Sequence, residues 1–225
     1  YGYLEGGAET VEQFFNTHKG YYPRHAEVAS LRDNGELIAL KVKDTRRLIV
    51  IGPGPAESLA GKEWQIIPHL NSLEEVVLVD VSQKFCDEGG LYLTNHFKEA
   101  GRNVSVATLV CDYAEVATQI QQVNNTTVVC TGGLISNMPR IRGEDYPETQ
   151  MQQFLQAMGH IAGRGQSGKI VLGYDSNDDP EKILGSYDHP LFRDYIWACF
   201  SNALQRSGFT HKCPNIRDHF RHVTE

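Results

Sequence analysis

Short runs of aliphatic and β-branched residues recur between positions 46 and 206 and alternate with longer stretches of helical spacing. These runs, which are almost continuously apolar, lie at 47–51, 75–79, 104–110, 127–130 and 169–173. Such runs are typical of parallel strands that are buried on both faces. Each run precedes a turn rich in Gly, Asp, Asn or Ser and then a helical stretch, so five β–α units follow one another. The pattern predicts an α/β fold with a doubly wound, mainly parallel sheet.

Apolar residues at three- and four-residue spacing predict the helices. The clearest helix is 191–204, and Gly208 is expected to end it. Weaker helices are predicted at 151–161 and at 82–100, the second interrupted by two adjacent glycines, Gly89 and Gly90.

Two further helices, 10–17 and 25–40, are predicted before the first strand and are separated by a Gly-Tyr-Tyr-Pro segment. We therefore expect three parts: an N-terminal helical cap at 1–45, a sheet domain at 46–206 and a C-terminal tail at 207–225.

Charge and hydropathy exclude several classes of protein. Twenty-one Lys and Arg against 28 Asp and Glu give the 225-residue chain a net charge of −7, which argues against nucleic acid as the main partner. No apolar run approaches the roughly 20 residues of a membrane-spanning helix. The N-terminus has neither a basic nor an apolar leader segment, and it lacks an initiating Met, which suggests a trimmed or partial chain. We expect a cytoplasmic protein with no membrane and no nucleic-acid partner.

The cysteines and histidines favour neither disulfides nor a metal. The five cysteines are scattered and contain no Cys-x-x-Cys pair, so we expect reduced thiols. The only local His/Cys cluster comprises His211, Cys213, His219 and His222, and a polar terminal segment explains it better than a metal site does. No metal is predicted.

The ends of the first three predicted strands carry the residues of an adenosine pocket. In an open parallel sheet, ligands bind beyond the carboxyl ends of the strands. The first strand ends in a turn containing Gly52 and Gly54, which would let the backbone approach a ligand. The second ends at Asp80, an acid suited to two ribose hydroxyls, and the third is followed by Asp112 and Tyr113, which could read and stack on a base.

The chemistry of the first turn favours one nucleoside ligand. Glu57 replaces the third glycine of the dinucleotide fingerprint, and a carboxylate there would repel a pyrophosphate. A zwitterionic or cationic adenosine without phosphates tolerates the acid, so S-adenosylmethionine is the candidate cofactor. The competing interpretation is a tight turn at Gly52 and Gly54 and an Asp80 that only caps a helix.

Five segments together resemble the histidine-specific, S-adenosylmethionine-dependent N-methyltransferases of ergothioneine biosynthesis. Residues 21–27, Tyr-Tyr-Pro-Arg-His-Ala-Glu, are similar to the family's Tyr-Tyr-Pro-Thr-Arg-x-Glu. The turn at 52–58 resembles the family's cofactor loop, and Val-Asp-Val-Ser at 79–82 resembles the end of its second strand. Segments at 111–115 and 130–138 are similar to its Gly-Asp-Phe-Glu and Leu-Gly-Ser-Thr-Ile-Gly-Asn-Leu. The resemblance covers positions 20–206 and implies a Rossmann-like class I methyltransferase fold.

The resemblance also implies roles for individual residues. The cofactor, S-adenosylmethionine, whose product is S-adenosylhomocysteine, would be lined by Tyr22, Gly52, Gly54, Asp80, Asp112, Tyr113 and Gly132. Asn137 and Tyr187 would hold and orient the amino-acid acceptor as catalytic and substrate-binding residues, and Tyr21 would close over that site. Asn137 could equally be a turn residue, and Tyr187 a packed core tyrosine.

Departures from the family pattern leave the acceptor open. Arg24 and His25 replace the family's Thr-Arg, and Ser58 replaces the lysine of the cofactor loop. The family continues beyond the position of Glu225 with a segment that reads the imidazole of the acceptor. We therefore expect methyl transfer to the amine of a small amino acid or similar molecule, histidine-like acceptors included. The alternatives are a methyltransferase of another small metabolite and a non-catalytic cofactor-binding module, or one completed by a second copy or partner segment.

Overall fold

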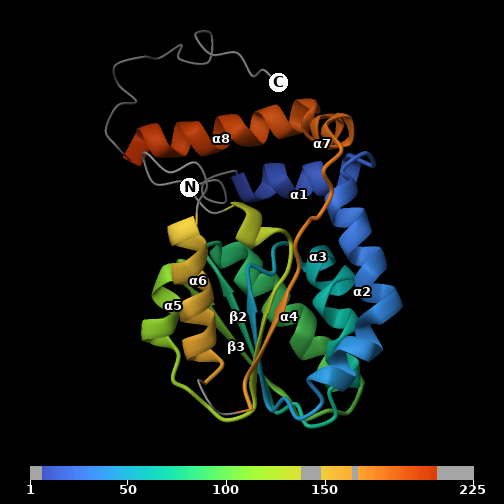
Figure 1. Ribbon diagram of the computed structural model, residues 1–225, viewed down its shortest axis with the longest axis vertical. Coiled ribbons are helices and arrows are strands. Elements are labelled where there is room, and N and C mark those ends of the chain that lie inside the picture. Colours follow the sequence, from blue (N-terminus) through green and yellow to red (C-terminus); the bar gives the residue numbers. More distant parts are fainter. Residues whose placement is uncertain (1–6, 138–147, 164–166, 207–225) are drawn as a thin grey trace. The chain divides into compact units, whose positions relative to one another are not determined.

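The computed structural model describes residues 7–137, 148–163 and 167–206 of the chain. Its centre is a five-stranded parallel sheet in the order β3-β2-β1-β4-β5 (Figure 1). The strands are β1 (Arg47–Ile51), β2 (Glu75–Asp80), β3 (Ser105–Val110), β4 (Thr126–Cys130) and β5 (Lys169–Leu172). The chain runs outward from β1 to β3 and then returns to the other side of β1. The strand order therefore reverses between β1 and β4, which confirms the doubly wound α/β prediction.

The chain divides into two units that we describe separately. The sheet unit is Ala26–Asp175, and the helical unit combines Tyr1–His25 with Ser176–Glu225. The predicted boundaries at residues 45 and 206 stay predictions.

Helices cover both faces of the sheet because successive strand residues point to opposite sides. Leu48 and Val50 of β1 pack with α2 (Tyr22–Lys41), α3 (Ala56–Gly61) and α4 (Gln83–Glu99). Ile49 and Ile51 pack on the other face with α5 (Tyr113–Gln119) and α6 (Glu148–Ile161). Figure 1 shows α5 and α6 on one side of the sheet and α2, α3 and α4 on the other. The described residues of this unit also contain three short 3₁₀ turns: η1 (Glu63–Gln65), η2 (Ile67–His69) and η3 (Leu134–Asn137).

Burial of the strands departs from the sequence prediction at the two sheet edges. Strands β1, β2 and β4 are buried almost throughout, as expected. The edge strands β3 and β5 are not, and Val110 and Ile170 are 41% and 38% exposed. Continuous apolar character therefore did not distinguish an edge strand from a central one, because both carry the same β-branched residues.

Helix α4 also differs from the prediction, because it runs without a break through Gly89 and Gly90. A Cβ built at Gly89 would lie 2.9 Å from Cδ1 of Leu78 on β2, and one at Gly90 would lie 3.1 Å from Cγ2 of Thr108 on β3. The two glycines therefore allow close packing on the sheet rather than interrupting the helix.

The helical unit contains α1 (Gly7–Thr17), α7 (Pro180–Tyr187) and α8 (Pro190–Arg206), together with the first residues of α2. Helices α1, α2 and α8 confirm the predicted segments, but α2 begins at Tyr22, inside the predicted connection. Helix α7 was not predicted. Its N-cap is Asp179, whose carboxylate accepts the backbone N–H groups of Glu181 and Lys182. The expected stop at Gly208 lies outside the described residues. None of the described helices is long and apolar enough to cross a membrane.

Candidate functional site

The turn after β1 presents backbone amides at the centre of the carboxyl edge of the sheet. Gly52 and Gly54 have φ of +65° and +69°, a conformation that is inexpensive only for glycine. The N–H of Gly52 donates to the carbonyl of Val79 at 2.8 Å, which holds the turn beside the end of β2. The predicted cofactor turn therefore has the backbone shape that close approach of a ligand requires.

Asp80 ends β2 next to this turn. Its Oδ1 accepts the N–H of Ser82 at 2.9 Å, and its Oδ2 lies 3.4 Å from the N of Gly54. Burial raises the pKa of the Asp80 carboxyl, whereas these N–H donors and the charge of Lys62 act to lower the pKa. The structure thus brings Asp80 and Gly54 together.

Asp112 and Tyr113 follow β3, the strand that neighbours β2. The N–H of Cys111 donates to the carbonyl of Asp80 at 3.1 Å, which ties the two strand ends together. The ring of Tyr113 meets Phe154 of α6 edge-on, with centroids 5.4 Å apart, and burial raises the pKa of its hydroxyl. The ring is half-buried, and the Asp112 residue is exposed.

Gly132 follows β4 on the other side of β1 and has φ of +73°. Its N–H donates to both carboxylate oxygens of Glu27, at 2.8 and 2.9 Å. Glu27 lies on α2 in the segment that carried the family resemblance, but the sequence analysis assigned it no role. Gly173, which follows β5, leaves room for the Glu27 carboxylate, because a Cβ at this position would lie 2.2 Å from Oε1 of Glu27.

Two buried charges at the end of α3 were missed by the sequence analysis. Lys62 and Glu63 are 5% and 1% exposed, and Nζ of Lys62 lies 3.8 Å from Oε1 of Glu63. The hydroxyl of Thr131 donates to the same oxygen, whereas Oε2 of Glu63 has no hydrogen-bond partner among the described residues. Burial raises the pKa of Glu63. A Lys-Glu pair inside an apolar stretch just after the cofactor turn is the signal that could have revealed them.

The three tyrosines Tyr21, Tyr22 and Tyr187, which were predicted to contact the acceptor or the cofactor, lie in the helical unit. The rings of Tyr21 and Tyr187 meet edge-on with centroids 5.6 Å apart, although 166 positions separate them in the sequence. Nζ of Lys182 lies 4.9 Å from the centroid of the Tyr22 ring. The structure therefore brings together the two tyrosines that were predicted to contact the acceptor. Asn137 is the last residue of η3 and belongs to the sheet unit.

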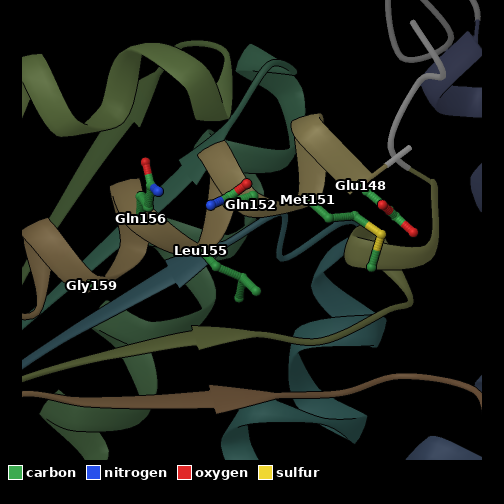
Figure 2. Close-up of a pocket in the computed structure, with 6 residues that line it drawn as sticks. All are labelled: Glu148, Met151, Gln152, Leu155, Gln156 and Gly159. Atoms are coloured by element: carbon green, nitrogen blue, oxygen red, sulfur yellow. The ribbon is translucent and has the colours of Figure 1, made fainter. Parts of the chain in front are cut away.

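A shallow groove lies along α6, lined by Glu148, Met151, Gln152, Leu155, Gln156 and Gly159 (Figure 2). In Figure 2 the side chain of Gln156 points away from that of Leu155. The groove contains none of the predicted site residues, and we assign it no role.

The thiols of the sheet unit are structural. Burial raises the pKa of Cys86 to about 11 and that of Cys130 to about 12. Cys86, Cys111, Cys130 and Cys199 are free. Within the described ranges no group of three His, Cys, Asp or Glu side chains could hold a metal. The terminal cluster of His211, Cys213, His219 and His222 lies outside those ranges.

The residues at the strand ends fit an adenosine ligand that carries no phosphate. Glycine conformations open the turn after β1, Asp80 provides an acid at the next strand, and Glu57 places a further carboxylate in the first turn of α3. These residues lie beyond the carboxyl ends of the strands, where doubly wound α/β proteins bind their ligands.

A scan against protein-family models matches residues 1–223 to the family described as histidine-specific methyltransferase, SAM-dependent. The chain belongs to this family and is an S-adenosylmethionine-dependent methyltransferase with a Rossmann-like fold. A search of curated proteins found no significant match.

Proposed function

We propose that this methyltransferase acts on the amine nitrogen of a small amino acid or amino-acid-like molecule, with histidine-like acceptors as the first candidates. The match of almost the whole chain to a histidine-specific family carries the proposal. The edge-on contact of Tyr21 and Tyr187 supports it, because both belong to segments expected to contact such an acceptor.

Gly52, Gly54, Asp80, Asp112, Tyr113 and Gly132 are proposed to hold the cofactor, with Tyr22 as a further contact. S-adenosylmethionine supplies an activated methyl group on a sulfonium. Asp80 would accept hydrogen bonds from the ribose hydroxyls, and Tyr113 would lie against the base. The exposed Asp112 would accept a hydrogen bond from the exocyclic amine of the base.

The acceptor amine needs orientation and loss of a proton, because only an uncharged nitrogen can attack the methyl group. Transfer proceeds by in-line displacement, in which correct placement of the two reactants supplies most of the rate enhancement. Asn137 and Tyr187 are proposed to orient the nitrogen, with the Tyr187 hydroxyl or solvent accepting its proton. The Tyr21 ring would close over the acceptor.

The test is incubation with S-adenosylmethionine and a panel of amino acids and biogenic amines, histidine among them, followed by mass spectrometry. We expect a product whose mass increases by one or more methyl groups at the α-amine. Methylation of only a carbon, oxygen or sulfur atom, or of no candidate while the cofactor still binds, would contradict the proposed acceptor class. In the second case a second copy or partner segment that completes the acceptor site would become the leading explanation.

A further inference from the structure

Two opposite charges are held against the same glycine at the carboxyl end of β4. The Glu27 carboxylate accepts the N–H of Gly132 with both oxygens. Nζ of Lys62 would lie only 3.1 Å from a Cβ built at the same glycine. Both charges belong to the sheet unit, and Gly132 has φ of +73°, a backbone conformation that residues with a side chain rarely adopt.

These charges do not neutralise each other. Among the described residues Lys62 forms no ion pair with Glu27 within 4.0 Å, and its nearest carboxylate is Glu63 at 3.8 Å. Nζ of Lys62 has no hydrogen-bond partner in the described part of the chain. Burial raises the pKa of Glu63, whereas the charge of Lys62 acts to lower it. The Lys62 ammonium, on a side chain that is 6% exposed, therefore has one ion pair at 3.8 Å and keeps N–H donors that a ligand carboxylate could accept.

The surroundings identify the chemistry of that ligand. A positive and a negative group close to one backbone position complement the carboxylate and the ammonium of an α-amino acid. Each Glu27 oxygen also retains a lone pair after accepting the Gly132 N–H. The positive charge of Lys62 also acts to lower the pKa of Asp80, the proposed ribose ligand, so the two groups interact electrostatically. A ligand that joins a ribose to an amino acid fits this arrangement.

We propose that Lys62 and Glu27 bind the methionyl end of S-adenosylmethionine, Lys62 its carboxylate and Glu27 its ammonium. The inference rests on the cofactor site described above and adds two residues that it did not include. Gly173 contributes indirectly, because any side chain there would displace the Glu27 carboxylate.

Calorimetric titration with two ligands tests the proposal without measuring turnover. S-adenosylhomocysteine carries the amino-acid end, whereas 5′-methylthioadenosine has the same nucleoside and lacks that end. We expect Lys62→Met and Glu27→Gln each to weaken S-adenosylhomocysteine binding by about ten- to a hundredfold, the range for hydrogen bonds to charged groups. Binding of 5′-methylthioadenosine should change less than about threefold, and Lys62→Arg should retain most of the affinity.

The matched controls are Lys43→Met and Glu36→Gln, which remove exposed charges elsewhere in the sheet unit. Equal losses for both ligands, or no loss for either, would overturn the proposal. An increased KM for the acceptor with unchanged S-adenosylhomocysteine affinity would assign the two charges to the acceptor and also overturn it.

If Lys62→Met does not fold, the ligand affinities of Glu27→Gln test the proposal. We expect this variant to fold, because Glu27 is only half-buried on a helix. If the wild-type protein binds neither ligand, the cofactor site itself is wrong. If instead the wild-type protein binds and the variants bind equally well, the cofactor site stands and only the roles of Lys62 and Glu27 are wrong.

Discussion

The backbone N of Gly54 lies 3.4 Å from Oδ2 of Asp80, so the turn after β1 and the end of β2 share one contact. Because Oδ1 of the same carboxylate accepts the N–H of Ser82, Asp80 is oriented before any ligand arrives. Such preorganisation reduces the entropy that a ligand must lose when it binds.

Asp80→Asn should weaken S-adenosylhomocysteine binding by about ten- to a hundredfold, because it removes charge-assisted hydrogen bonds to the ribose. The amide oxygen can still accept the N–H of Ser82, so we expect a melting temperature near that of the wild type. Calorimetry and thermal melting measure the two effects. The control is Asp33→Asn, at an exposed position of α2. Full retention of affinity in Asp80→Asn would reject the adenosine pocket.

Tyr187→Phe should lower kcat for the amine acceptor at least about tenfold, because it removes a hydroxyl proposed to orient or deprotonate the nucleophile. The ring contacts with Tyr21 and Phe192, at centroid distances of 5.6 and 4.9 Å, remain available to phenylalanine. Stability and S-adenosylhomocysteine affinity should therefore be preserved. Tyr174→Phe, at a residue 71% exposed, is the matched control. Unchanged turnover in Tyr187→Phe would remove Tyr187 from the proposed mechanism.

Glu63→Gln should stabilise the protein increasingly as pH rises. Burial raises the pKa of Glu63 above 4.5, so the native state holds this proton more tightly than the unfolded state does. The contribution of Glu63 to stability is therefore present below pH 4.5 and is lost as pH rises through the folded pKa. Glutamine keeps an acceptor for the Thr131 hydroxyl and cannot ionise.

Melting curves of wild type and Glu63→Gln between pH 4.5 and about 9 test this prediction. The difference in melting temperature should increase with pH in favour of the variant. A difference that does not depend on pH would show that Glu63 has the same protonation in the native and unfolded states.

Gly35→Ala and Gly159→Ala should have opposite effects although both glycines lie inside helices. A Cβ at Gly35 would lie 2.2 Å from the backbone oxygen of Gln65, so we expect a loss of about 2–3 kcal/mol in the free energy of unfolding. A Cβ at Gly159 meets nothing within 4 Å, and alanine should add about 0.5–1 kcal/mol through helix propensity. Urea denaturation compares the two, and equal effects would contradict the packing difference.

The sequence predicted those features of the fold that depend on local pattern. Continuous apolar runs located all five strands, and glycines at the ends of β1 and β4 marked turns that do adopt positive φ. The exposure of β3 and β5 could not be predicted, because which strand lies at an edge depends on strand order rather than composition.

The candidate site was only partly predictable for a similar reason. Asp80 could be found because it is the last residue of a strand. The placement of Glu27 beside Gly132 depends on how α2 packs against the sheet, across 105 positions of sequence. Lys62 and Glu63 received no role in the sequence analysis, because burial of a charge at a helix end is a tertiary effect.

The two adjacent glycines of α4 make this helix dependent on the sheet beneath it. Each glycine costs about 1 kcal/mol of helix propensity relative to alanine, so the segment has little tendency to be helical alone. Leu78 and Thr108 press against it where other residues would carry a side chain. We therefore expect helix α4 and strands β2 and β3 to unfold as one cooperative unit, with amides that exchange hydrogen together.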